Sequence, residues 1–131
     1  MNNIAEAASS SAGTEDEEIV EIRKKLLHHL KTRSLILAGN ESTWSTRGKS
    51  CSWLIDTRVL LLDPLTMSWI SRLFWKRMKN VNDFKLACLE MTGIPLLAGI
   101  QSHGFQVGRH VNGVIVRKER KSNGRLRAIE G

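Results

Sequence analysis

A run of basic residues near the carboxyl end of the chain has the residue types best suited to chemistry. Residues 114–124 read Val-Ile-Val-Arg-Lys-Glu-Arg-Lys-Ser-Asn-Gly, a short apolar stretch followed by four cations and a glycine. This pattern predicts a strand that leads into a basic loop. Cations placed at the end of a strand could neutralise an anionic group such as a phosphate. The same run is also typical of a solvated loop without a ligand.

Other candidate motifs lack residues that their chemistry requires. Gly48-Lys49-Ser50 resembles the end of a phosphate-binding P-loop, but Thr43 stands where that motif needs a glycine, and no apolar strand precedes it. The four histidines have no Glu or Cys at ligand spacing, so the sequence predicts no metal site. Cys51 and Cys88 are expected to be small core residues rather than nucleophiles. The four tryptophans are expected to pack in the core or at an interface rather than to stack on bases.

The overall composition is that of one basic globular domain. The chain has 131 residues, 41% hydrophobic and 25% charged, with a net charge of +7. Residues 1–19 hold five acids and no base, so all of the excess positive charge lies in the rest of the chain. Such a basic domain favours an anionic partner: a nucleic acid, a phosphorylated metabolite or a membrane surface. With neither a membrane-spanning run nor a secretory signal, we expect a cytoplasmic protein.

The first part of the chain predicts a tail and a helix. Residues 1–13 lack periodicity and are expected to be a disordered tail, followed by one domain over residues 14–131. Thr14 and Glu17 match a capping box, in which the two side chains accept hydrogen bonds from backbone donors at a helix start. The first helix should therefore begin here and end near Gly39-Asn40.

Helices and strands are expected to alternate in the remainder of the chain. Asp63-Pro64 has the residue types of an N-cap and a first helical position, which predicts a helix extending to about Asn80. Strands are expected at 53–56, 59–62, 84–89 and 111–116, and a short helix at 95–103. This alternation predicts an α/β fold, with a parallel or mixed sheet covered by helices.

Several segments resemble orotate phosphoribosyltransferases. That family's loop signature, Arg-Lys-Glu-x-Lys-x-His-Gly after a strand, is similar to residues 114–124, with Asn123 in place of the histidine. Residues 90–96 (Glu-Met-Thr-Gly-Ile-Pro-Leu) resemble its Gly-Ile-Pro-Leu turn, which opens a helix. Residues 46–58 are similar to its Lys-Ser-Gly segment and the aromatic residues that follow. Residues 129–131 look like the Glu-Gly that follows the loop in the family. Taken together, the resemblance spans roughly residues 34–131.

The resemblance implies a fold, a reaction and a set of site residues. The fold is a phosphoribosyltransferase-type sheet flanked by helices, and the reaction transfers ribose 5-phosphate from phosphoribosyl pyrophosphate to a nucleobase, in pyrimidine nucleotide metabolism. Mg²⁺ carried by phosphoribosyl pyrophosphate is the implied cofactor, and a homodimer is the implied assembly. The implied phosphoribosyl pyrophosphate-binding residues are Arg117, Lys118, Lys121 and Asn123. The possible substrate-side residues are Thr46, Arg47, Leu54, Ile55, Met91 and Thr92.

The sequence also departs from this family. Thr46 stands where the family has its substrate-side lysine, and Leu54-Ile55 stands where it has an aromatic pair. Met91-Thr92 replaces its Tyr-Lys pair. These replacements remove charges and stacking surfaces, so the acceptor base stays open. The family continues beyond the Glu-Gly into an apolar strand, two aspartates and a Thr-x-Gly phosphate loop, whereas this sequence stops at Gly131. We therefore expect an N-terminal portion of the enzyme, incomplete at its C-terminal side, without catalytic residues of its own and inactive alone.

Alternatives to the enzyme hypothesis stay open from the sequence. The chain could be a basic module that binds nucleic acid through residues 117–127. It could also be a regulatory subunit that donates its loop to a complete phosphoribosyltransferase. In an incomplete domain, part of the sheet's apolar face would lack a cover. Self-association or pairing with a complementing C-terminal fragment is then expected.

Overall fold

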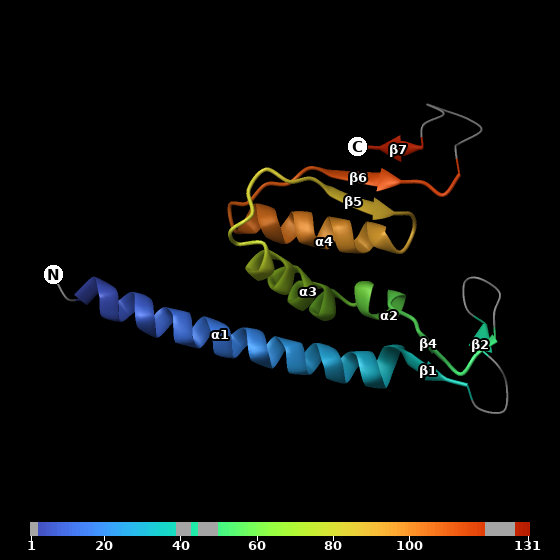
Figure 1. Ribbon diagram of the computed structural model, residues 1–131, viewed down its shortest axis with the longest axis horizontal. Helices are drawn as coiled ribbons and strands as arrows, with labels where there is room; N and C mark the ends of the chain where they lie inside the picture. The colour runs from blue at the N-terminus through green and yellow to red at the C-terminus, as the bar shows by residue number, and fades with distance from the viewer. Residues whose placement is uncertain (1–2, 39–42, 45–49, 120–127) are drawn as a thin grey trace.

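The structure, a computed structural model, describes residues 3–38, 43–44, 50–119 and 128–131. A long helix, α1 (Asn3–His29), runs along the base of the molecule and ends in a π-helical turn, η1 (Leu30–Ser34) (Figure 1). The elements that follow are β1 (Leu35–Leu37), β2 (Thr43–Trp44), β3 (Ser50–Cys51), β4 (Trp53–Ile55), α2 (Arg58–Leu61), α3 (Pro64–Arg77), β5 (Leu86–Leu89), α4 (Gly93–Gln106), β6 (Gly113–Val116) and β7 (Ile129–Glu130).

The strands form two small ladders and one three-stranded sheet. β1 pairs with β4 and β2 with β3, both antiparallel. The main sheet has the order β5-β6-β7, in which β5 and β6 are parallel and β7 is antiparallel to β6. α4 connects β5 to β6 and packs against them, as expected of a parallel crossover. The predicted mixed sheet covered by helices is therefore confirmed for this part of the chain.

The start of α3 follows the sequence prediction closely. Pro64 occupies the first turn, where its missing N–H costs no hydrogen bond. The Asp63 carboxylate accepts a hydrogen bond from the backbone N–H of Thr66 at 2.8 Å, and a second from the Thr66 hydroxyl. Those two hydrogen bonds, with Arg33 nearby, hold the pKa of Asp63 below its usual value. The helix ends at Arg77, three residues before the expected end.

We predict that Asp63→Ala lowers the melting temperature by a few degrees at pH 7, because the first turn of α3 loses its cap. A carboxyl with a depressed pKa in the folded state stabilises the fold above its unfolded pKa of about 4, and that contribution is lost as the pH falls through the folded pKa. Asp63→Asn keeps a capping oxygen and does not titrate, so its melting temperature should lack this acid-dependent loss. Thermal melts at pH 7 and pH 3 measure both effects. Identical acid sensitivity of Asp63→Asn and the parent chain would refute this account of the cap.

The core lies where α3 packs on α4. Trp75 is 6% exposed, and its indole N–H donates to the carbonyl of Ile100 at 2.8 Å. Gly104 lets the two helices approach, because a Cβ there would lie 2.5 Å from the carbonyl oxygen of Arg109 and against the Trp75 ring. Arg109 stacks over that ring, 4.8 Å from its centre, and donates to the Met78 carbonyl at the end of α3.

α1 packs along α3 through a mixed interface. Ile19 and Ile22 are buried, and Glu18 forms an ion pair with Arg72 at 2.7 Å. Asp16 and Lys76 form a second ion pair at 3.2 Å. Among the residues that the structure describes, no helix is long and apolar enough to span a membrane.

The first helix differs from the sequence prediction at both ends. α1 begins at Asn3, where the sequence predicts a disordered tail, and it runs through the expected capping box. The tail is rich in alanine, the strongest helix former, and this propensity explains the earlier start. The expected end near Gly39-Asn40 is also wrong, because Leu35–Leu37 pairs with β4 and leaves the helix at Ser34.

The strand expected at residues 59–62 is also wrong. Arg58–Leu61 forms the short helix α2, in which the backbone N–H of Leu61 donates to the carbonyl of Thr57 at 3.0 Å. A four-residue apolar run fits a strand and a partly buried helical turn equally well, because it is too short to show a period. The expected strands at 53–56, 84–89 and 111–116 are present as β4, β5 and β6 with shorter bounds.

Candidate functional site

The candidate site lies at the carboxyl ends of β5 and β6. The two strands are parallel and Leu89 is in register with Val116, so Glu90 and Arg117 leave the sheet side by side. The loops beyond this edge therefore come from segments that lie far apart in the sequence. In open α/β sheets, ligands bind at the carboxyl edge of the strands.

An ion-pair cluster fixes this edge. The Arg117 guanidinium lies 3.3 Å from a Glu90 carboxylate oxygen and 3.1 Å from a Glu130 carboxylate oxygen. The backbone N–H of Lys118 donates to the other oxygen of Glu90 at 3.3 Å. Arg117 also donates its backbone N–H to the carbonyl of Ala128 at 2.8 Å. Arg117 thus joins β5, β6 and the segment leading into β7.

The side chains of the loop residues differ in their surroundings. Arg117 is three-quarters shielded and its charge is compensated by two carboxylates. Its role in binding phosphoribosyl pyrophosphate stays a prediction, because in this structure the guanidinium holds the sheet edge together. Lys118, the residue that follows Arg117, is exposed. Lys121 and Asn123 lie outside the described residues.

The substrate-side residues fall into two places. Met91 and Thr92 follow Glu90 directly and lead into α4, so they lie at the same edge as Lys118. The amino end of α4 also faces this edge, where its unpaired N–H groups and dipole favour an anion. Leu54 and Ile55 lie on β4, half-buried, and among the described residues no strand pairing joins β4 to the main sheet. Thr46 and Arg47 lie outside the described residues.

The sequence analysis missed the role of Glu90 and Glu130. Both were part of the resemblance, but neither was assigned a contact. A signal for Glu90 is nevertheless present, since it follows one parallel strand as Arg117 follows the next. Residues at the same position after adjacent parallel strands meet at one edge, and opposite charges there form an ion pair.

The described side chains do not fit a resident Mg²⁺ site. No group of three or more His, Cys, Asp or Glu residues in the described part of the chain is placed to hold a metal ion. Glu90 and Glu130, the carboxylates at the candidate edge, both pair with Arg117. A magnesium ion at this edge would therefore depend on ligands that the described residues do not supply.

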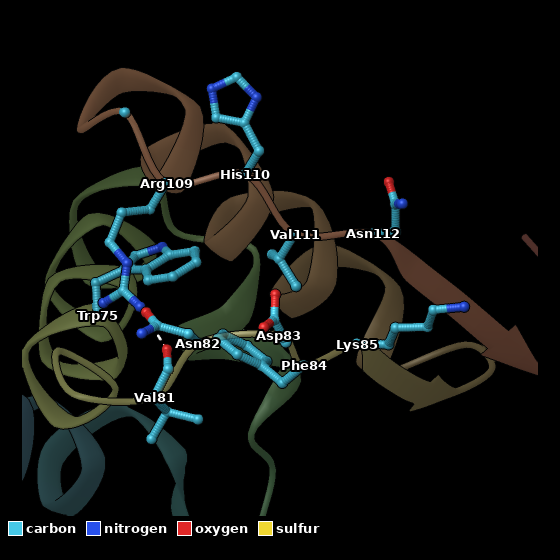
Figure 2. A pocket seen from close by; sticks show the side chains of 11 residues that line it. Trp75, Val81, Asn82, Asp83, Phe84, Lys85, Arg109, His110, Val111 and Asn112 are labelled. Carbon is cyan, nitrogen blue, oxygen red and sulfur yellow. Dashed lines mark hydrogen bonds between the residues drawn. The ribbon is translucent and has the colours of Figure 1, made fainter.

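A groove of about 740 Å³ opens at the opposite end of the sheet, where β5 and β6 begin. Trp75 and Phe84 form its apolar wall, and Figure 2 shows that the polar side chains of Lys85, His110 and Asn112 lie apart and do not converge. The Arg109 guanidinium is already engaged by backbone carbonyls, including that of Val81 at 2.7 Å. Without convergent polar groups, this groove is a weaker candidate than the carboxyl edge.

The ion-pair cluster leads to a stability prediction. Glu90→Gln should lower the free energy of unfolding by about 1–2 kcal/mol, because a partly shielded guanidinium loses one of its two carboxylates. Glu119→Gln is the matched control, since Glu119 is exposed two residues beyond Arg117 and should change stability by less than about 0.5 kcal/mol. Urea denaturation of both variants measures the difference. Equal effects would mean that the Glu90–Arg117 pair does not stabilise the sheet edge.

Comparison with solved structures identifies the fold as the α/β fold of phosphoribosyltransferases. The orotate phosphoribosyltransferase of Mycobacterium tuberculosis matches 84% of this chain with a TM-score of 0.64 at 22% identity, and the match covers 59% of that protein. A phosphoribosyltransferase of Corynebacterium diphtheriae matches 85% with a TM-score of 0.64 at 18% identity, over 58% of its length. UMP synthase of Leishmania donovani matches 86% with a TM-score of 0.59 at 24% identity, over 22% of its length.

The sequence is similar to orotate phosphoribosyltransferase in particular. The enzymes of two strains of Tropheryma whipplei, Twist and TW08/27, are each 30% identical to it over 111 residues, which is 84% of this chain. The chain spans about half the length of these curated relatives. No protein-family model matches it. The comparisons therefore confirm the resemblance to orotate phosphoribosyltransferases and do not favour the nucleic-acid-binding alternative.

Proposed function

We propose that the chain forms part of an orotate phosphoribosyltransferase-like enzyme of pyrimidine nucleotide metabolism. Its ligands would be phosphoribosyl pyrophosphate, with Mg²⁺ bound to it, and a nucleobase, and its assembly would be a homodimer. The observation that carries the proposal is the 111-residue match to orotate phosphoribosyltransferase. The carboxyl-edge geometry supports it, because the segment before α4 and the start of the basic loop lie together there.

The residues at this edge suit a departing pyrophosphate. When the bond to the anomeric carbon breaks, negative charge grows on the leaving group and positive charge on the ribose. Lys118, exposed at the edge, can neutralise part of that negative charge, and α4 adds backbone N–H donors at Gly93. Arg117 and Glu90 hold the Lys118 backbone in place and so act as positioning residues. Glu90 and Glu130 both pair with Arg117, so the exposed Lys118 is the cation at this edge that can face the ligand.

A binding titration of the chain alone tests the proposal. Isothermal calorimetry with phosphoribosyl pyrophosphate and Mg²⁺ should show weak, saturable binding, because a chain that spans half of its relatives carries only part of their contacts. Inorganic pyrophosphate should compete for the site, whereas ribose 5-phosphate should not.

Two exposed lysines provide the matched variants: Lys118 lies after the carboxyl end of β6, and Lys85 lies before the amino end of β5. Lys118→Ala should weaken the binding of inorganic pyrophosphate, and Lys85→Ala, at the amino end of β5, should leave it unchanged. Equal losses from the two variants would contradict the proposed site. Absence of saturable binding, or binding of mixed-sequence RNA with a steep salt dependence, would contradict the proposed function.

A further inference from the structure

A basic cleft of about 380 Å³ lies between α1 and the ends of α3 and α4. In Figure 1, α3 and α4 both end on the side of the molecule where β5 and β6 begin, which is opposite to the carboxyl edge. The cleft is therefore separate from the candidate site. Five of its nine lining residues are basic, and we call this surface the basic cleft. These five are Arg72, Lys76, Lys79, His103 and Arg109.

The cations of α3 form one stripe along the helix. Arg72, Lys76 and Lys79 are spaced four and three residues apart, which places them on the same helix face. The stripe continues past the end of α3, because the backbone N–H of Lys79 still donates to the carbonyl of Lys76 at 3.4 Å. Seven residues of a helix rise by about 10 Å. A stripe of this length suits a chain of two or three phosphate groups better than a single phosphate ion.

Carboxylates of α1 compensate only part of this charge. Glu18 pairs with Arg72 at 2.7 Å, and Asp16 pairs with Lys76 at 3.2 Å. Lys79 is exposed, and it has no carboxylate partner within the part of the chain that the structure describes. The basic cleft therefore keeps an excess of positive charge, which attracts an anion.

Arg109 is held in a fixed position at the edge of the cleft. Its guanidinium donates to the carbonyls of Met78 and Val81, at 3.0 and 2.7 Å, and stacks on Trp75. These bonds serve the carbonyl groups at the end of α3, so the dipole of that helix does not require further cations there. A guanidinium has five N–H donors, and the others can bind a ligand. A cation that is already fixed loses little conformational entropy on binding.

We propose that the basic cleft binds an oligophosphate, either as a free anion or as the phosphate tail of a nucleotide. The α3 stripe and Arg109 contact the phosphate oxygens through charge-assisted hydrogen bonds. Asp16 and Glu18 are intramolecular counter-ions with which the ligand competes. This site goes beyond the proposed function, because it lies at the amino end of the parallel strands and uses no residue of the carboxyl edge.

An extended nucleic acid fits this cleft less well. α1 borders the cleft and carries four acidic residues within two turns: Asp16, Glu17, Glu18 and Glu21. The phosphates of a long chain that continued past the cleft would be repelled by these carboxylates. An oligophosphate avoids this repulsion because it is short enough to stay on the α3 stripe.

An NMR titration of the full 131-residue chain with inorganic tripolyphosphate tests the proposal residue by residue. The backbone amide signals of Lys79, His103 and Arg109 should shift saturably. ATP is the second probe and distinguishes the two sources of the ligand. Tighter binding of ATP than of tripolyphosphate would indicate a nucleotide, and equal or weaker binding would indicate a free anion.

Two exposed lysines provide the matched variants for this titration. Lys79→Ala should weaken the binding of tripolyphosphate about five- to tenfold, because one charge-assisted contact is lost. Lys24→Ala should leave it unchanged. At about 100° per residue, Lys24 lies on the side of α1 opposite to the buried Ile19 and Ile22. Both lysines are exposed, so neither change should affect folding.

Two glutamates of α1 test the competition by the counter-ions. Glu18→Gln should tighten the binding of tripolyphosphate about two- to threefold, because it removes a negative charge from the cleft. Glu21→Gln is the control, since Glu21 pairs with Lys25 on its own helix at 3.6 Å and does not line the cleft. A Glu18→Gln variant that binds no more tightly than Glu21→Gln would contradict this role of α1.

Three results would overturn the proposal: equal effects of Lys79→Ala and Lys24→Ala, shifts confined to the amide of Lys118, or binding of mixed-sequence RNA without binding of tripolyphosphate. Lys118→Ala, the variant that tests the proposed function, should leave the shifts of Lys79 and His103 unchanged. A failure of this inference is therefore distinguishable from a failure of the proposed function.

Discussion

Trp75→Ala should lower the free energy of unfolding by about 3–5 kcal/mol, which is enough to unfold a marginally stable domain. The indole fills the space between α3 and α4, and it contacts the ring of Phe84 at a centroid distance of 5.9 Å. It also contributes the hydrogen bond to Ile100 and the surface on which Arg109 stacks. A large cavity and the loss of these contacts act together. Urea denaturation followed by circular dichroism measures the change.

Trp53→Ala is the matched control for this prediction. Trp53 has the same side chain but is 56% exposed on β4, so its removal should cost less than about 1 kcal/mol. Similar losses from the two variants would mean that the α3–α4 contact is not the centre of the core.

Lys121→Ala should weaken the binding or turnover of phosphoribosyl pyrophosphate about ten- to a hundredfold in a complete assembly. A shielded, charge-assisted contact to a pyrophosphate oxygen is worth about 1.5–3 kcal/mol, and tenfold in binding corresponds to about 1.4 kcal/mol. The expectation comes from the resemblance of residues 114–124 to the family's loop. Steady-state kinetics measure it in an equimolar mixture of this chain with the part of the Tropheryma whipplei enzyme that lies outside the matched segment.

Arg127→Ala is the control for the loop prediction. Arg127 carries the same charge in the same basic run but lies beyond the motif, so its loss should have little effect. If Lys121→Ala and Arg127→Ala cause equal losses, the ligand is held by bulk positive charge. The loop roles carried over from the family would then be wrong.

The sequence predicted best the elements that local chemistry determines. Asp63-Pro64 specifies its own helix start, because the cap and the proline act within one turn. The strands at β5 and β6 were predictable because apolar runs alternate with a helix that must cross between parallel neighbours. Tertiary pairing decided the rest. The sequence predicts that the first helix includes Leu35–Leu37, but these residues form a strand because they pair with β4.

The candidate site was predictable in part. The resemblance assigned Arg117-Lys118 to the phosphoribosyl pyrophosphate-binding loop and Met91-Thr92 to the substrate side, and in the structure these two segments lie at the same sheet edge. It did not reveal that Arg117 would be paired with two carboxylates, since Glu130 is distant in the sequence and reaches Arg117 only through β7. Charge pairing across strands depends on register, which composition does not report.

The most direct test of the central claim is an assay of ribose 5-phosphate transfer by the reconstituted enzyme. Phosphoribosyl pyrophosphate, Mg²⁺ and orotate are supplied to the chain, to the part of the Tropheryma whipplei enzyme that lies outside the matched segment, and to their equimolar mixture. The whole enzyme is the positive control. The account predicts orotate-dependent release of pyrophosphate from the mixture and from the whole enzyme, and none from either polypeptide alone. A mixture in which the two polypeptides associate but release no pyrophosphate would contradict it.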